Sequence, residues 1–389
     1  MEQQNGVHKS YKYRLHPTPA QEQALDTVLW RCRTLYNAAL EQRKTWWERG
    51  QGKGATYYQQ AMELPDLKPA YPDYAEVNAQ VLQDVLRRLD KTFQAFFRRV
   101  QVVEKAGYPR FQGAGRYHSF TDPQYGRGAV LDGGMLSLSK IGRIPIRLHR
   151  PLQGTPKTVT ISLEADGWYA CFSCAEVPMQ PLEPTGQETG IDLGLESFAT
   201  LADGTMIHNP RRYRKAEAYL RRCQRRVSRR KKGSARRRQA VALLAKAHQT
   251  VKRQRQDFHH KAALSLVRAY DTIYHEDLQT ANMLKHHHLA KSIQDAGWSG
   301  FLSLLVFKAA YAGKQAVAVP PAFTSQACSG CGVIVQKGLS VRWHGCPECG
   351  TSLHRDHNAA LNIMALGRQQ SAVGQAVQAL TWPGGASVA

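Results

Sequence analysis

The sequence has no long hydrophobic run. No stretch of eighteen or more apolar residues occurs in its 389 residues, so no membrane-spanning helix is predicted. The first fifteen residues, MEQQNGVHKSYKYRL, also have no apolar stretch of the kind that a secretory signal needs. We therefore expect a cytoplasmic protein without a membrane partner, whose cysteines stay reduced.

Acidic residues are also scarce. The chain has 30 Asp and Glu against 53 Lys and Arg, a formal net charge of +23, and this excess indicates a polyanionic partner such as nucleic acid. The imbalance is concentrated between Arg211 and Gln256, where nineteen Lys or Arg accompany one acid, Glu217. A solvated helix face is the plain alternative for such a segment. Because unpaired like charges repel unless phosphate neutralises them, we expect it to contact nucleic acid.

Cysteine is infrequent, but four of the eight cysteines form two close pairs. Each pair has the spacing Cys-x-x-Cys, and fourteen residues separate the pairs. The four residues are Cys328, Cys331, Cys346 and Cys349. Four thiolates complete a tetrahedral zinc site and leave no position for water, so we predict a structural zinc ion. Cys171 and Cys174 have the same local spacing but no partner pair, and we expect them to be core thiols.

Hydrophobic periodicity divides the first half of the chain into helices and strands. Helical spacing begins after Thr18, a capping residue, and a second amphipathic helix is predicted from about Val77 to Val100. From about residue 112 the period changes to two, and Asp166 with Gly167 predicts a hairpin turn. A joint rich in Pro and Gly follows, and we predict a domain boundary near residue 183.

The second half alternates strands with helices. The stretch GIDLGLESFATLADGTMI predicts strands with a turn at Asp203-Gly204, and two basic helices joined at KKGSA follow. Further strands are predicted at DTIYHEDL and QAVAV, with an apolar helix between them and a short helix, NAALNIMALG, near the end. From Arg368 the sequence has no clear period, and we expect a tail without regular structure.

Three acids lie at the ends of predicted elements. Asp192 ends a strand, Glu276 ends the strand TIYHE, and Asp356 stands just before the last helix. Each has a plain explanation as a strand end, an exposed residue or a helix cap. Clustered carboxylates can, however, hold two divalent ions, and Mg²⁺ prefers such oxygen ligands. The order Asp, Glu, Asp on these elements matches an RNase H-like layout of the RuvC type, which predicts a nuclease.

The sequence resembles TnpB, a family of RNA-guided nucleases of bacterial insertion sequences that is related to type V CRISPR effectors. The resemblance covers nearly the whole chain and is carried by YKYRLHPTPAQ, VLQDVLRRLDKTFQAFFRR with GYPRFQG, GIDLGLESFATLADG, QRRVSRRKKGSARRR, CSGCG, CPECG and HRDHNAALNI. It places the catalytic, magnesium-binding acids on Asp192, Glu276 and Asp356. The zinc ligands fall on the four cysteines named above.

The resemblance also implies an α+β multidomain fold. We expect a β-barrel wedge domain from residues 1–15 and 112–182, a helical recognition domain from 16–111, an RNase H-like RuvC nuclease domain from 183–320 and 352–367, a zinc-binding insert that contacts target nucleic acid from 321–351, and a tail from 368–389.

Activity and partners follow from the same resemblance. A guide RNA transcribed from the transposon end pairs with the target, while the protein reads a short adjacent motif and cuts double-stranded DNA with two Mg²⁺ ions. The expected assembly is a monomer on RNA that associates with the nucleoid when DNA is bound. Alternatives are a nuclease-inactive RNA-guided repressor, a compact type V CRISPR effector and a DNA transposase.

Contacts to nucleic acid are expected in two places. Early residues of the second helix, Asn78, Gln80 and Gln83, are candidates for reading the adjacent motif, with a plain helix surface as an equal alternative. In the basic segment, arginines three or four positions apart share a helix face and can meet RNA or heteroduplex phosphates. These are Arg221, Arg222, Arg225, Arg226, Arg229 and Arg230.

Overall fold

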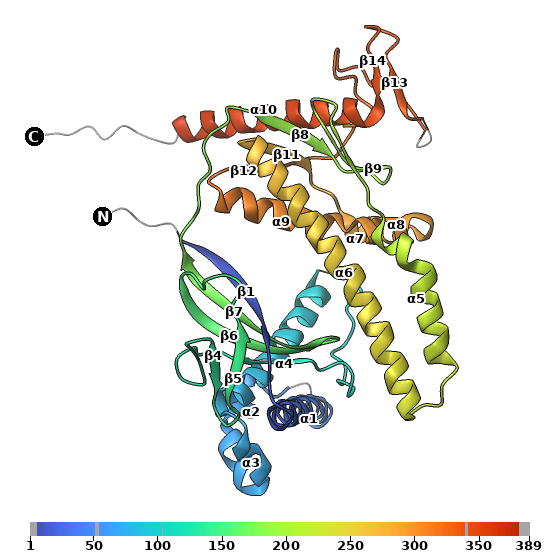
Figure 1. The fold of residues 1–389 in the computed structure, drawn as a ribbon. Helices are drawn as coiled ribbons and strands as arrows, with labels where there is room; N and C mark the ends of the chain where they lie inside the picture. Colours follow the sequence, from blue (N-terminus) through green and yellow to red (C-terminus); the bar gives the residue numbers. More distant parts are fainter. Residues whose placement is uncertain (1–5, 51–53, 103, 339–340, 381–389) are drawn as a thin grey trace, which may run out of the picture. The chain divides into compact units, whose positions relative to one another are not determined.

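The computed structural model describes residues 6–50, 54–102, 104–338 and 341–380. The chain forms two compact units, an N-terminal unit, Met1–Pro178, and a C-terminal unit, Met179–Ala389. Figure 1 shows the course of the chain through both units. Within the described ranges, no helix combines the length and the apolar character needed to cross a membrane.

The helices of the N-terminal unit confirm the sequence periodicity. They are α1 (Pro19–Arg49), α2 (Tyr57–Met62), α3 (Leu64–Ala70), a 3₁₀ helix (Pro72–Glu76) and α4 (Ala79–Gln101). Thr18 caps α1: its hydroxyl oxygen accepts a hydrogen bond from Gln21 N, and Gln21 Oε1 accepts one from Thr18 N, which satisfies two N–H groups at the helix start. The apolar faces of α1 and α4, with Leu25 and Leu89 fully buried, form the helical core of this unit.

A seven-stranded sheet forms the rest of the N-terminal unit, in the order β2-β6-β7-β1-β5-β4-β3. Its strands are β1 (Val7–Leu15), β2 (Ser119–Asp122), β3 (Ala129–Asp132), β4 (Met135–Leu138), β5 (Gly142–Arg147), β6 (Thr155–Glu164) and β7 (Gly167–Val177). All neighbouring strands are antiparallel, and β6 and β7 form the predicted hairpin. The first strand of the chain therefore pairs with strands that follow it by more than 125 positions, Arg14 with Arg147 among them.

The C-terminal unit contains a five-stranded sheet in the order β10-β9-β8-β11-β12. Its strands are β8 (Glu188–Asp192), β9 (Ser197–Leu201), β10 (Met206–His208), β11 (Thr272–Glu276) and β12 (Gln315–Val319). Strands β8, β11 and β12 are parallel, whereas β9 and β10 are antiparallel to their neighbours. The unit also has a small ribbon of β13 (Trp343–Gly345) and β14 (Ser352–His354).

Six helices complete the C-terminal unit within the described ranges. They are α5 (Arg212–Ser228), α6 (Ala235–Ala269), α7 (Thr280–Met283), α8 (His287–Ala296), α9 (Trp298–Tyr311) and α10 (Arg355–Leu380). Helices α5 and α6 confirm the two predicted basic helices, and residues 229–234 join them at the predicted position.

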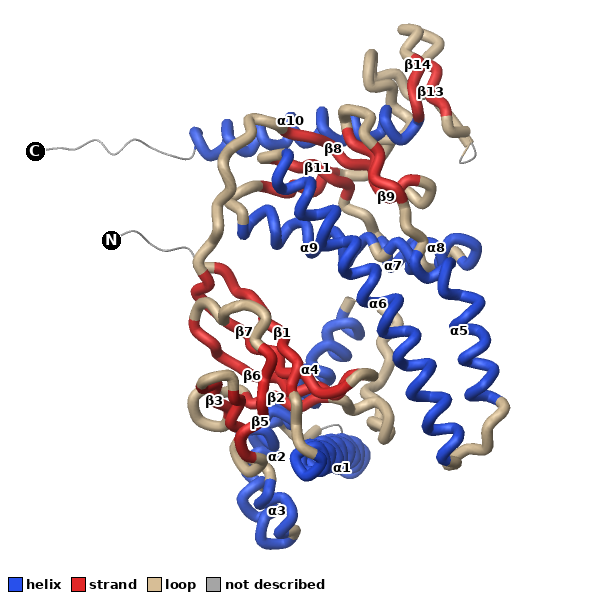
Figure 2. Tube along the Cα trace, viewed as in Figure 1, coloured by secondary structure: helices blue, strands red, loops and turns tan. Residues whose placement is uncertain are grey.

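Helices cover both faces of this sheet (Figure 2). Successive strand residues point to opposite faces, so Ile273 packs with the core of α6 and α9 while Tyr274 packs with Ile363 of α10. Helix α10 lies very close to β8, because a Cβ added to Gly190 would lie 2.2 Å from the carbonyl oxygen of Ala360. Glycine at position 190 is what allows this approach.

One prediction for the C-terminal end is wrong. Helix α10 extends to Leu380, so the expected tail without regular structure does not begin at Arg368. Residues 369–380, QQSAVGQAVQAL, are rich in Ala and Gln, which are strong helix formers and need no amphipathic period to continue a helix. Residues 381–389 of the expected tail lie outside the described residues.

Candidate functional site

Two of the predicted acids lie at the same edge of the C-terminal sheet. Asp192 is the last residue of β8 and Glu276 the last residue of β11. The two strands are parallel neighbours, and their register pairs His275 with Ile191. Continuing that register by one residue places Glu276 beside Asp192, because the carboxyl ends of parallel strands meet at one edge of a sheet.

The third acid reaches this edge from α10. Asp356 is the second residue of the helix and is almost completely buried, and one of its carboxylate oxygens lies 3.8 Å from the position that a Cβ would take at Gly194, two residues after Asp192. The close packing of α10 on Gly190 holds the start of the helix at the strand ends. The structure therefore brings the three predicted acids together although 164 positions separate Asp192 from Asp356.

The carboxylates act on one another electrostatically. Burial raises the pKa of Asp192 well above its ordinary value, and the negative charges of Glu276 and Asp356 raise it further, while Arg355 opposes the shift. Burial also raises the pKa of Glu276, and the Thr324 hydroxyl, which donates a hydrogen bond to Glu276 Oε1, opposes that shift. Crowded, partly desolvated carboxylates of this kind are stabilised by a cation that neutralises them.

The donor set fits a hard divalent cation, because it consists of carboxylate oxygens. A metal ion can be held by three or more Cys, His, Asp or Glu side chains whose ligand atoms all lie within 4.8 Å of one another. Among the described residues, the four cysteines form such a group. The ligand atoms of the three acids do not all lie within that distance of one another.

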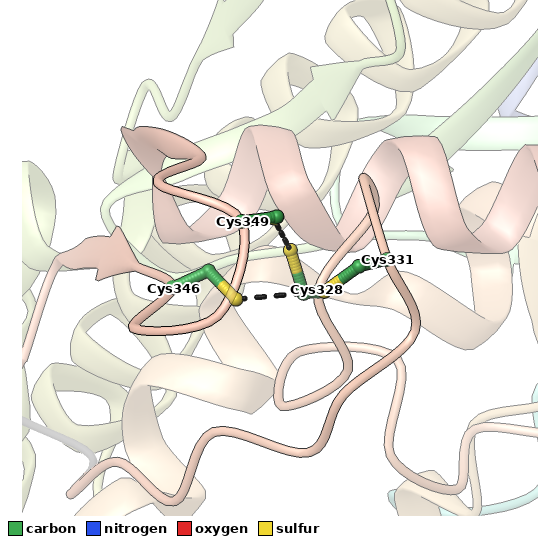
Figure 3. Close-up of side chains that lie close together, drawn as sticks. All are labelled: Cys328, Cys331, Cys346 and Cys349. Carbon is green, nitrogen blue, oxygen red and sulfur yellow. Dashed lines mark hydrogen bonds between the residues drawn. The ribbon is translucent and has the colours of Figure 1, made fainter.

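The four predicted zinc ligands form that close cluster (Figure 3). The Sγ atoms of Cys328 and Cys349 are 3.6 Å apart, and those of Cys331 and Cys346 are 3.5 Å apart. Ligands of a tetrahedral zinc ion with Zn–S bonds of about 2.3 Å have sulfur atoms about 3.8 Å apart, so the cluster fits zinc. No histidine belongs to the cluster among the described residues.

The surroundings of the cluster favour a thiolate. Burial alone would raise the pKa of Cys328, but the nearby His344 side chain and the N–H groups of Gly330 and Cys331 lower it to about 5, whereas the neighbouring sulfur atoms raise the pKa of Cys331. Zinc binds the thiolate form of cysteine, so this environment prepares Cys328 to act as a ligand near neutral pH.

Polar residues of α10 connect the acids to the cysteine cluster, and the sequence analysis missed them. Asn358 is completely buried, and its side chain accepts a hydrogen bond from Ser329 N and donates one to Ala327 O. Asn362, one helical turn later, donates to Thr324 O and Ala327 O. Two asparagines four positions apart in the otherwise apolar stretch NAALNIMALG were the available signal, because a buried side-chain amide needs partners.

The basic helices expose most of the predicted arginines on one surface. Leu220, Cys223 and Val227 of α5 are buried, the first of them packing with Ala247 and Val251 of α6. A hollow of about 660 Å³ on α5 is lined by Ala218 and five of the candidates, Arg222, Arg225, Arg226, Arg229 and Arg230. The sixth candidate, Arg221, forms an ion pair with Glu217 at 2.6 Å.

The three candidates on α4 lie at its start. Asn78 is the N-cap, and its Oδ1 accepts a hydrogen bond from Gln80 N at 2.8 Å. Gln80 donates to the side chain of Gln124 in the loop after β2, while its own Oε1 is buried without a partner among the described residues. Gln83 is half-buried one turn further along. The cap explains Asn78 structurally, whereas the unpaired oxygen of Gln80 has no structural explanation.

Three family models match parts of the chain. Residues 171–287 match OrfB_IS605, described as a probable transposase, and residues 298–363 match the TNB domain of Cas12f1-like proteins. Residues 1–52 match the helix-turn-helix domain of OrfB_IS605. In fold the chain is similar to the protein in a cryo-EM structure of a Cas12f1–sgRNA–target DNA complex, with a TM-score of 0.57 and 13% sequence identity over 92% of this chain and 99% of that one.

Two curated relatives match over almost their whole length. A "Putative RNA-guided DNA endonuclease" of Streptomyces pristinaespiralis is 36% identical over 381 residues, which are 96% of this chain and 92% of the relative. The "Putative RNA-guided DNA endonuclease InsQ" of Escherichia coli K12 is 30% identical over 390 residues, with 95% of each chain covered. At this identity and coverage the relationship extends over nearly the whole chain, and the chain therefore belongs to the TnpB family of insertion-sequence proteins.

Proposed function

We propose that this protein is the RNA-guided DNA endonuclease of an IS605-type insertion sequence, and that it cuts double-stranded DNA matched to its guide RNA. The observation that carries the proposal is the convergence of Asp192, Glu276 and Asp356 at one edge of the C-terminal sheet. The family membership and the curated relatives named as RNA-guided DNA endonucleases support it.

In this proposal the three carboxylates hold two Mg²⁺ ions. Held there, they would supply activation of a water molecule and stabilisation of the leaving oxygen of a phosphodiester. The chain's own residues prepare the site. Thr324 orients Glu276 through its hydroxyl, and the packing of α10 against Gly190 fixes Asp356 at the strand ends. The adjacent Arg355 is held by Gly338 O and Ser325 Oγ, which keeps its positive charge beside Asp192.

The domain assignment is part of the proposal. The pairing of β1 with β5 and β7 supports a wedge domain made of residues 1–15 and 112–182, with the helices of 16–111 as the recognition domain. We assign residues 183–320 and 352–367 to the RuvC domain, since β8, β11 and α10 carry its acids. Residues 321–351 form the insert with a structural zinc ion, which holds the loop that Asn358 and Asn362 bind.

Nucleic-acid contacts are assigned to two surfaces. The arginine-lined hollow of α5 would bind RNA or heteroduplex phosphates, because guanidinium groups pair with phosphate oxygens. Asn78, Gln80 and Gln83 at the start of α4 would read the adjacent motif, because side-chain amides can pair with base edges. Guide pairing would read the remaining target sequence.

The proposal is tested with a supercoiled plasmid library that carries a guide-matched target beside randomised bases. The protein is co-expressed with the RNA from the element's end, and cleavage is assayed in Mg²⁺ for the wild type, for Asp192→Ala and for Asp277→Asn. Asp277 is an exposed acid next to Glu276 and serves as the matched control. We expect linear product from the wild type and the control only. Bound but intact plasmid with all three proteins would replace this function with that of an RNA-guided repressor.

A further inference from the structure

An aromatic cavity in the N-terminal unit has no part in the function described above. It lies between the later turns of α1 and α4, has a volume of about 440 Å³, and is walled by five aromatic side chains. These are Trp47, Phe93, Phe96, Phe97 and Tyr108. Apart from residues 54–56, the remaining lining side chains are polar, namely Arg43, Asp90 and Gln94.

The rings hold one another in place. Tyr108 packs edge-on against Phe93 at 5.7 Å and against Phe96 at 5.4 Å between ring centroids. Phe96 and Phe97 are in contact at 5.3 Å. Such tilted and edge-to-face pairs restrain one another, so the wall of the cavity is formed before anything binds.

Two of these rings are far more exposed to solvent than the side chains of an ordinary hydrophobic core. Trp47 is 54% exposed and Phe97 is 47% exposed, although Phe93 beneath them is buried. Large aromatic groups that stay open to water beside a cavity mark a binding surface, because their burial by a ligand is favourable. The cavity is therefore a site with a formed wall and an open rim.

The polar groups of the cavity already have partners. Asp90 accepts hydrogen bonds from Arg43 at 3.1 Å and from Gln94 at 2.7 Å, so its negative charge is neutralised inside the protein. Arg43 also donates to Gln60 and lies over the face of Phe93 at 5.0 Å. A ligand thus meets aromatic faces and no unpaired carboxylate among the lining residues, which favours a neutral, flat group.

Further cations lie on the two helices that carry the aromatic wall. Lys44, beside Arg43 on α1, lies over Phe111 at 5.0 Å, and Arg87 of α4 lies over Tyr57 at 5.5 Å. Lys91, Arg98 and Arg99 are exposed on the same turns of α4 as the cavity residues. A flat group attached to an anionic chain suits this surface, whereas a basic or purely apolar peptide would not use the cations.

We propose that this cavity binds an unpaired nucleobase of single-stranded nucleic acid. The base would stack on the exposed faces of Trp47 and Phe97, and the phosphates on either side of it would meet lysines and arginines of the same helices, such as Lys44 and Arg87. The inference rests on the nucleic-acid binding in the proposed function, but it does not require cleavage.

The test measures binding of twelve-nucleotide single strands to the full chain by fluorescence anisotropy. Uridine RNA, thymidine DNA and an abasic chain of the same length are compared. Trp47→Ala and Phe97→Ala remove exposed rings of the cavity. Trp30→Ala removes an equally exposed ring, 50% exposed, that lies on α1 but does not line the cavity.

We expect both cavity variants to bind the base-containing strands about tenfold more weakly than the wild type, with Trp30→Ala unchanged. The abasic chain should bind all four proteins alike. A larger loss on RNA would assign the base to the guide, and a larger loss on DNA would assign it to the target. Unchanged affinities in the cavity variants, or an equal loss on the abasic chain, would overturn the inference.

Crosslinking provides a measurement that does not depend on the variants' stability. Strands that carry 5-iodouracil are irradiated on the wild-type protein, and the crosslinked residues are identified by mass spectrometry. Crosslinks at Trp47, Phe97 or Tyr108 support the site, and crosslinks confined to other aromatic residues refute it. If no base-containing single strand binds the protein, this inference is overturned, whereas the proposed function is tested separately by plasmid cleavage with the RNA from the element's end.

Discussion

Replacing Gly190 with alanine should separate cleavage from binding. In the structure the new Cβ would lie 2.2 Å from Ala360 O and 2.6 Å from Met364 N. These are backbone atoms that cannot rotate away, so α10 must move from the sheet by about 1 Å to restore an ordinary contact. Asp356 lies one helical turn before Ala360 and moves with the helix.

The expected magnitudes follow from that displacement. Forcing an extra methyl group into a packed interface reduces the free energy of unfolding by about 1–3 kcal/mol. A misplacement of about 1 Å in a catalytic group can reduce the rate about 100-fold. Guide-RNA binding should persist, because α5 and α6 pack on each other through their own apolar faces.

The assay combines thermal unfolding, an RNA-binding titration and the initial rate of plasmid linearisation. Gly300→Ala is the matched control, since it makes the same change in α9 of the same unit, where an added Cβ meets nothing within 4 Å. The control should cleave at the wild-type rate with equal or slightly higher stability. A Gly190→Ala protein that unfolds and cleaves like the wild type would refute the argument that α10 positions Asp356.

Three further predictions concern other parts of the molecule. Cys346→Ala should abolish stoichiometric zinc and lower the unfolding temperature, as measured by metal analysis and calorimetry, and an unchanged zinc content would contradict the ligand assignment. Replacing Arg225 and Arg229 by uncharged Gln should weaken RNA binding. It should also reduce the slope of log affinity against log salt concentration by about 2, whereas an unchanged slope would exclude α5 from phosphate contact. Burial lowers the pKa of His259, whose ring nitrogen lies 2.8 Å from Ala296 O, so the folded state resists protonation of this side chain. The free energy of unfolding should therefore fall as the pH drops below about 6.5 and level off below the pKa of the folded state. Denaturation curves recorded at a series of pH values should lose this dependence in His259→Gln.

The elements of the fold were largely predictable because their signals are local. Thr18 and Gln21 form the capping box that their spacing indicates, and the period-two stretch around Asp166 folds as a hairpin. The cysteine spacing likewise predicted the cluster of four thiols, since each close pair points two thiols at one centre. Such patterns depend on neighbours within one turn or one hairpin.

Features that depend on distant partners were not predictable in the same way. No local pattern shows that Asn358 binds the backbone at Ala327 and Ser329, or that Gly190 is required by a helix that follows 165 positions later. The length of α10 was missed because its last residues have strong helix propensity without an amphipathic period. The convergence of the three acids could be proposed from their order, but the register of β8 and β11 places two of them side by side.

The late position of Asp356 has a consequence for protein synthesis. Eighty residues separate it from Glu276, and at about 5–20 residues per second a ribosome needs roughly 4–16 seconds to add them. During that interval the basic helices are already made, whereas the third acid does not yet exist. With the role proposed for Asp356, the basic surface of a nascent chain exists for several seconds before its set of acids is complete, so the order of the sequence itself places the means of cutting DNA last.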